Sequence, residues 1–226
     1  MTRTGAAARP PVDIEERAHS LLDWAQTNLR AVLLGLAIVV AAGIGVWLYV
    51  ATQANKEQRA SSELARASGA VAAGNFALAE TDLSRVVQQY GGTDAGKQAA
   101  LLLSEALYGQ GKYQQGIDAL QPHADRAPDY LRTAFRSQIA AGYEELGNFA
   151  EAAQAYLRAA ESARFDADRS ILRADAARAF TLAGNATAAR EIWEAEASDE
   201  TSPVREEARV RLGEMTAQAA RPAPAQ

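Results

Sequence analysis

The sequence has no cysteine, two histidines and few aromatic residues (7%). Without cysteine the chain has no disulfide, no cysteine nucleophile, no iron–sulfur cluster and no lipidated anchor. The two histidines, His19 and His123, are too few for a histidine-rich metal site, so we expect no metal and no cofactor. Abundant alanine with few aromatic residues favours tightly packed helices over sheets, and an all-α fold is predicted.

Positive charge is not in excess, because 23 lysines and arginines face 28 acidic residues and leave a net charge of −5. This balance argues against nucleic acid as a partner. Residues 91–97 (GGTDAGK) resemble the start of a phosphate-binding loop, but Gln98 stands where the motif needs Ser or Thr. We interpret the segment as a loop in which Thr93 or Asp94 caps a helix. With His123 placed in a polar loop, we expect no enzyme and no small-molecule substrate.

Long apolar runs are absent except at residues 31–50, where 20 consecutive residues carry no charge. A helix of this length spans roughly 30 Å, which matches the hydrocarbon core of a bilayer. The alternatives are a cleavable signal peptide, whose apolar region is shorter, and a buried soluble helix, which would not be apolar on every face. We predict a single uncleaved transmembrane helix. Small residues four apart, Ala31 with Gly35 and Ala41 with Gly45, are candidates for packing within the membrane.

The residues before this run carry four arginines, which favour a cytoplasmic N-terminus. They are Arg3, Arg9, Arg17 and Arg30. Apolar residues from Ile14 to Leu29 recur at helical spacing, with Asp13 as a cap, and predict an amphipathic juxtamembrane helix. It lies on the inner leaflet or binds a cytoplasmic partner. The predicted organisation is a cytoplasmic tail (1–30), the membrane helix (31–50), an exported domain (51–217) and a disordered tail (218–226).

The exported domain is a repeat marked by four glycines at spacings of 37, 36 and 37 residues: Gly74, Gly111, Gly147 and Gly184. Matching residue classes recur at fixed offsets from these glycines. Two positions later stand Phe76, Tyr113, Phe149 and Ala186; five later Ala79, Gly116, Ala152 and Ala189; nine later Leu83, Leu120, Tyr156 and Trp193. This register predicts about four stacked helical hairpins, each with a left-handed glycine in its turn. A last helix from Val204 to about Ala217, started by Ser202 and Pro203, is expected to cap the stack.

The Gly-x-aromatic-x-x-Ala turn, best seen at 143–152 (YEELGNFAEA), resembles the tetratricopeptide repeat (TPR) family. The repeat period in this chain is longer than is usual for the family, and Gly116 replaces the usual alanine. The resemblance implies a concave protein-binding groove lined by the first helix of each hairpin. The matching positions here are Leu101, Glu105, Tyr108, Ser137, Ala141, Glu144, Arg178 and Thr181. The family's Lys and Asn clamp for carboxylate tails is missing at these positions.

The complete arrangement is similar to the ancillary SecYEG translocon subunit family of bacterial inner membranes. The similarity covers most of the chain and is most specific at 188–194 (AAREIWE), followed by Ser202-Pro203. It implies a single-pass inner-membrane scaffold with a periplasmic domain. The implied partners are the translocon, a membrane-anchored periplasmic peptidyl-prolyl isomerase and newly exported chains. The alternative is an assembly or structural subunit of another membrane complex, whether respiratory, photosynthetic or of the envelope.

Overall fold

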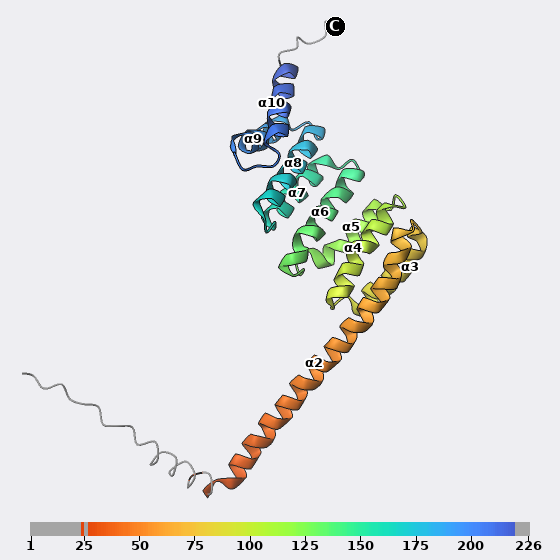
Figure 1. Ribbon diagram of the computed structural model, residues 1–226, viewed down its shortest axis with the longest axis vertical. Helices are drawn as coiled ribbons and strands as arrows, with labels where there is room; N and C mark the ends of the chain where they lie inside the picture. Colours follow the sequence, from red (N-terminus) through yellow and green to blue (C-terminus); the bar gives the residue numbers. More distant parts are fainter. Residues whose placement is uncertain (1–23, 25–26, 220–226) are drawn as a thin grey trace, which may run out of the picture. The chain divides into compact units, whose positions relative to one another are not determined.

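The computed structural model describes Trp24 and residues 27–219, and within them the fold is helical without strands (Figure 1). Asp13, most of the predicted amphipathic segment and residues 220–226 lie outside the described residues. The described helices are α2 (Leu29–Ala72), α3 (Phe76–Tyr90), α4 (Asp94–Tyr108), α5 (Tyr113–Ala124), α6 (Asp129–Glu145), α7 (Phe149–Glu161), α8 (Asp166–Leu182), α9 (Ala186–Ser198) and α10 (Arg205–Ala219).

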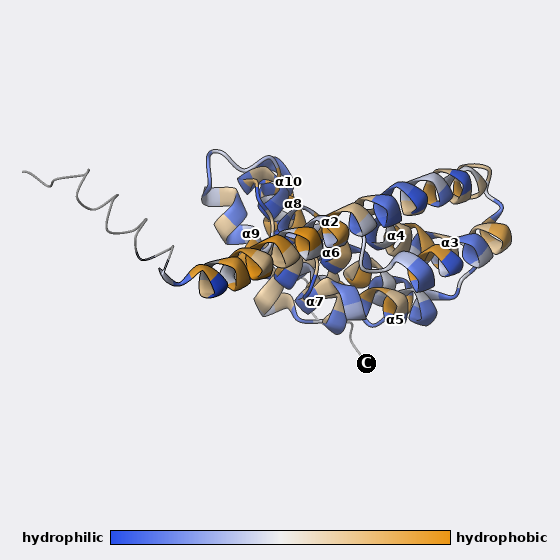
Figure 2. Ribbon diagram, turned by 90° about the horizontal axis from the view of Figure 1, so that it is seen from below, coloured by the Kyte–Doolittle hydropathy of each residue, from blue (hydrophilic) through white to orange (hydrophobic). Residues whose placement is uncertain are grey.

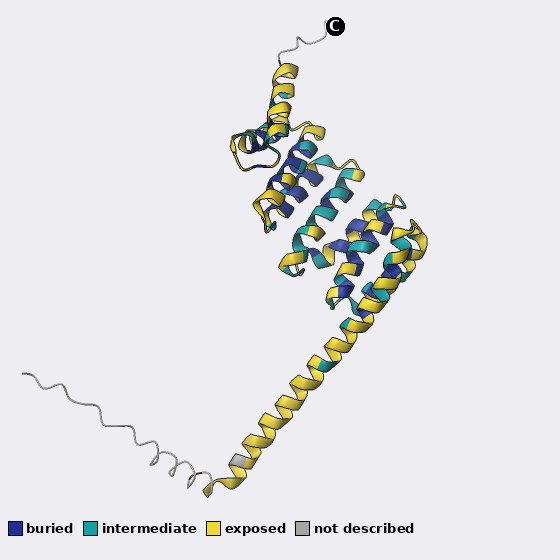
Figure 3. Ribbon diagram, in the orientation of Figure 1, coloured by how far each residue is buried: buried dark blue, intermediate teal, exposed yellow. Residues whose placement is uncertain are grey.

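The chain divides into two compact units, Met1–Ala54 and Asn55–Gln226. In the first unit, the described part of α2 is strongly apolar (Figure 2), and every described side chain from Leu29 to Val50 is exposed (Figure 3). Among the described residues, α2 is the one helix long and apolar enough to cross a membrane. The exposure of these described side chains argues against a buried core helix.

The second unit is a stack of helical hairpins. The end of α2 shares a buried core with α3 and α4. The pairs α4–α5, α6–α7 and α8–α9 follow, with α10 packed on α9. All four predicted turn glycines have positive φ, from 70° at Gly74 to 77° at Gly184. In each turn the residue after the glycine donates its N–H to a carbonyl five residues back, as Asn148 does to Tyr143 (2.9 Å). This is the Schellman arrangement, and it explains why the same pattern recurs in all four turns.

The residues at the repeated offsets hold the hairpins together. Phe76, Tyr113 and Phe149 begin the second helices, and the small residues five positions after each glycine are all buried. Gly116 is the informative exception to alanine. A Cβ there would lie 2.2 Å from a ring carbon of Tyr108, so the tyrosine ring occupies the space that a methyl group fills in the other hairpins.

Two local expectations need correction. His123 is not in a polar loop: α5 continues through Pro122 to Ala124, and the His123 ring stacks on Phe135 with the ring centroids 5.9 Å apart. A proline in the last turn removes one hydrogen bond but does not force the helix to stop there. At the other end of the domain, α10 begins at Arg205, not at Val204. Ser202 is buried, and its hydroxyl accepts from the N–H of Val204 (3.3 Å) and donates to Glu196 (2.7 Å).

Candidate protein-binding surface

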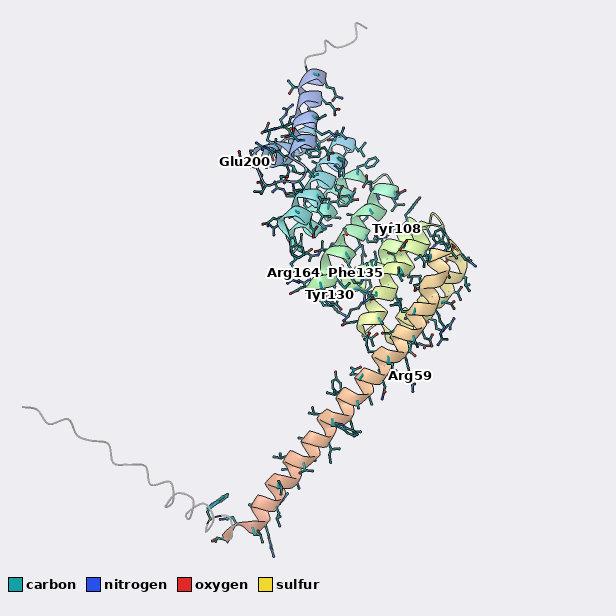
Figure 4. The ribbon with its side chains drawn as sticks, viewed as in Figure 1. Arg59, Tyr108, Tyr130, Phe135, Arg164 and Glu200 are labelled. Atoms are coloured by element: carbon teal, nitrogen blue, oxygen red, sulfur yellow. The ribbon has the colours of Figure 1, made fainter. Side chains whose placement is uncertain are left out.

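The groove residues predicted on α4 and α6 have mixed surroundings. Glu105 is exposed, whereas Leu101 and Tyr108 are partly buried and pack against the core formed by α4, α5 and α6. The hydroxyl of Tyr108, a residue labelled in Figure 4, donates to the carbonyl of Gln138 on α6 (2.9 Å). Burial raises the pKa of this phenol. Ser137, half-buried, donates to the carbonyl of Ala134 (3.1 Å). Tyr108 therefore joins two neighbouring first helices, as well as standing at a groove position.

Further along the stack, one polar contact links α6 with α7 and another links α8 with α10. The hydroxyl of Tyr156 on α7 donates to Oε2 of Glu144 on α6 (2.8 Å). Burial, with this hydrogen bond, raises the pKa of Tyr156. On α8, Arg178 pairs with Asp175 and reaches Glu207 on α10 (2.6 Å). Two of the predicted residues, Glu144 and Arg178, thus each make a polar contact to a neighbouring helix, and Ala141 lies half-buried one turn before Glu144.

Arg178 and Thr181 also share a hollow of 240 Å³ between α8, α9 and α10. Its lining includes four residues of α10 and two further apolar ones: Arg211, Glu214, Met215 and Gln218, with Leu182 and Trp193. Sequence reasoning missed these six residues as site candidates. The spacing of Glu207, Arg211 and Glu214 marks one face of α10, but only the packing of α10 beside α8 shows that this face meets the groove residues.

A second hollow of 330 Å³ lies between α5, α6 and α7 and includes none of the predicted groove residues. Arg136 crosses it, donating to the carbonyl of Arg158 (3.0 Å) and pairing with Asp125 (3.5 Å). These contacts tie the three helices together, so we assign this hollow a structural role.

The segment that resembles a phosphate-binding loop forms the start of α4, and its backbone N–H groups already donate to side chains of the protein. Thr93 caps α4 by accepting from the N–H of Gly96 (3.0 Å), as expected. The two carboxylate oxygens of Glu57, on α2, accept the N–H groups of Asp94 and Ala95 (both 2.9 Å). A phosphate would have to displace this carboxylate, which argues against nucleotide binding at the site.

In α2, a Cβ added at Gly35 or Gly45 would meet nothing within 4 Å, and Ala41 is exposed. Packing of these small residues against a partner helix stays a prediction. No group of three or more His, Cys, Asp or Glu side chains that could hold a metal ion is found in the described part of the chain.

The fold has counterparts among solved structures. Two crystal structures of nearly identical TPR-like repeats from a putative kinesin light chain of Podosopora anserina match it. One gives a TM-score of 0.55 at 19% identity, covering 72% of this chain and 88% of that chain. The other gives 0.52 at 18% identity, covering 74% and 99%. At these identities the likeness shows the fold alone. The search of curated proteins found no match.

A family model described as a tetratricopeptide repeat-like domain matches residues 23–221, which is most of the chain and includes the apolar helix. Repeats of this kind typically form non-enzymatic modules that bind other proteins. The glycine turns, the stacked hairpins and this match agree, and the chain belongs to the tetratricopeptide repeat-like domain family.

Proposed function

We propose that this protein is a membrane-anchored, non-enzymatic adaptor that binds protein partners through the face formed by the first helices of its hairpins. The observation that carries the proposal is the composition of α2. Its first part is an apolar run whose described side chains are exposed, and its last part packs into the TPR-like stack as the first helix. Such a chain joins a bilayer-sized segment to a protein-binding module.

Exposure of the apolar run supports the membrane role. Leaving these side chains in water costs on the order of 25 cal/mol for each Å² of apolar surface, a cost that a bilayer removes. Among alternatives, a cleaved signal sequence would need a shorter apolar region near a processing site. The four arginines before the run support a cytoplasmic N-terminus and a repeat domain on the other side of the membrane.

The more specific role we propose is ancillary to the Sec translocon of a bacterial inner membrane, beside periplasmic chaperones. Its support is the resemblance at 188–194 and at Ser202-Pro203. In the structure Trp193 is 1% exposed and Ser202 bonds to buried Glu196. These residues therefore act in packing, and the contacts with a partner belong to the exposed groove face.

The test is in-membrane crosslinking of the tagged full-length protein, followed by gentle-detergent purification and mass spectrometry. Recovery of translocon subunits with a periplasmic peptidyl-prolyl isomerase would support the specific role. Recovery of one different complex in fixed stoichiometry would replace it with an assembly subunit of that complex. Failure to recover any protein partner would overturn the adaptor proposal. Glu105→Lys, at an exposed position of α4, with Glu151→Lys at an exposed position of α7 as the matched control, tests whether partners bind through the first helices.

A further inference from the structure

The hollow between α8, α9 and α10 has an apolar floor and an open, charged rim. Trp193 forms its base, whereas Leu182 at the end of α8 is 58% exposed. Met215 supplies a flexible apolar wall. The volume of 240 Å³ is below the range of about 300–1,000 Å³ typical of pockets for free small molecules. It is of a size to take a single large apolar side chain.

The repeat register shows that Thr181 stands where the second and third hairpins carry a longer side chain. The residue three positions before the turn glycine is Tyr108 in the second hairpin, Glu144 in the third and Thr181 in the fourth. Tyr108 reaches the backbone of the next first helix, and Glu144 accepts from Tyr156. Thr181 is short, and its hydroxyl donates to the carbonyl of Ala177 in its own helix (2.9 Å). Of the α8 residues that line the hollow, Arg178 reaches Glu207 on α10, whereas the short Thr181 side chain is held to its own helix.

Charges around the hollow select the partner's chemistry. Arg178 is already paired with Asp175 and Glu207, and Arg211 lies 3.0 Å from Glu214 and 3.7 Å from Glu207. When these partners are counted, three carboxylates (Asp175, Glu207 and Glu214) stand against the two guanidinium groups. The rim is therefore not a site for an anion. It complements a positively charged neighbour of the inserted side chain.

We propose that the hollow binds a leucine-, methionine- or phenylalanine-sized side chain from a protein segment that carries lysine or arginine beside it. The inference rests on the adaptor function proposed above and names the chemistry of the partner at one end of the groove. One inserted apolar side chain in a desolvated pocket, with charges at the rim, is the usual form of an interaction hot spot.

The experiment uses the full-length protein in nanodiscs of zwitterionic lipid and three fluorescein-labelled peptides of equal length. The first has a leucine flanked by lysines, the second has serine in place of the leucine, and the third has glutamates in place of the lysines. Fluorescence anisotropy is expected to show the first peptide binding at least tenfold more tightly than either of the others. Protein-free nanodiscs measure binding to lipid.

Two pairs of variants locate the binding. Thr181→Tyr restores the longer side chain of the second hairpin, and we expect it to fill the hollow and weaken binding about tenfold, which corresponds to 1.4 kcal/mol. Thr187→Tyr, at an exposed position of α9 outside the hollow, is its matched control. Glu214→Lys is expected to weaken binding several-fold. Glu206→Lys, on the same helix and paired with Arg209 away from the hollow, is not. Circular dichroism checks that each variant folds.

Equal binding of all three peptides, or of the wild type and Thr181→Tyr, would overturn the proposal. Stronger peptide binding after deletion of 220–226 would assign the hollow to the chain's own tail instead. Loss of a dimer in Thr181→Tyr, measured by analytical ultracentrifugation, would assign it to a second copy. Crosslinked partners that persist when peptide binding fails would leave the adaptor function standing and refute this inference alone.

Discussion

The two halves of the repeat domain build their cores from different side chains. In the half formed by α2 to α6, alanine supplies four of eight buried residues in one cluster and three of seven in the other. In the half formed by α6 to α10, thirteen of eighteen buried residues are alanine. Small residues allow close helix contact, but they concentrate apolar volume in a few large side chains, chiefly Trp193, Phe180 and Tyr156. Stability in the alanine-rich half should therefore depend on fewer positions.

The largest effect should come from Trp193→Ala, which we expect to lower the free energy of unfolding by about 3–5 kcal/mol. Urea unfolding of the full-length protein in detergent, followed by circular dichroism, measures it. Leu120→Ala, at the equivalent repeat position in the other half, should cost less. Equal costs would break the comparison between the halves. Trp47→Ala, in the exposed apolar run, should leave unfolding of the domain unchanged.

Gly116→Ala should cost about 1–3 kcal/mol because the added methyl group enters the space of the Tyr108 ring. The cost should fall when Tyr108 is also replaced by leucine, and a double-mutant cycle measures this coupling. If the two free-energy changes simply add, the Tyr108 ring is not the reason that alanine is unfavourable at position 116. At the equivalent position in the other half, Ala152→Gly should cost about 1 kcal/mol through helix propensity.

Replacing a glycine by alanine should lower the stability of the protein in a turn and raise it inside a helix. Gly147→Ala forces a side chain to φ of 76° and should cost about 1–2 kcal/mol. Gly213, inside α10 with open space around its Cβ position, should gain up to about 1 kcal/mol on replacement by alanine. Thermal unfolding of both variants against the wild type is the measurement. A gain in both would mean that the turn tolerates left-handed alanine.

The smallest expected effect is a change in the pH dependence of stability. Burial, with nearby Lys97, lowers the pKa of His123 in the folded protein. The unfolded chain therefore takes up this proton more readily, and stability should fall as the pH drops below the unfolded value of about 6.5. His123→Gln should remove part of the difference in urea midpoint between pH 7.5 and pH 5.5. An unchanged difference would show that other groups cause it. Because the ring packs on Phe135, the comparison is made between pH values within each variant.

The sequence predicts most of the fold because the repeat is local. A glycine in register specifies a left-handed turn, and the residues two, five and nine positions later follow from helix geometry. Pro122 misled the prediction for His123, because a proline near the end of a helix looks the same in sequence as one that stops it. The membrane helix was expected from length and charge, and its crossing of a membrane stays a prediction.

The candidate surface was harder to predict because it depends on contacts between helices far apart in the sequence. Arg178 and Thr181 were named from repeat register alone. Their neighbours on α10 depend on how that helix packs beside α8. Arg178 and Glu207 are 29 residues apart in the sequence, so no local pattern predicts their contact. The hollow itself follows from the shortness of Thr181, a feature visible in the aligned repeats once Tyr108 is seen to bridge two helices.

The carboxylate of Glu57 has a mechanical consequence. Its two oxygens hold two successive N–H groups at the start of α4, 37 and 38 residues away. A slide or rotation of residues 55–72 by one position would break both bonds together. A pull applied to the chain at Asn55 is therefore shared with α4 at the point of entry, before it reaches the turn at Gly74. Glu57 therefore couples the end of α2 directly to α4, and separating the first hairpin from the stack requires both bonds to break.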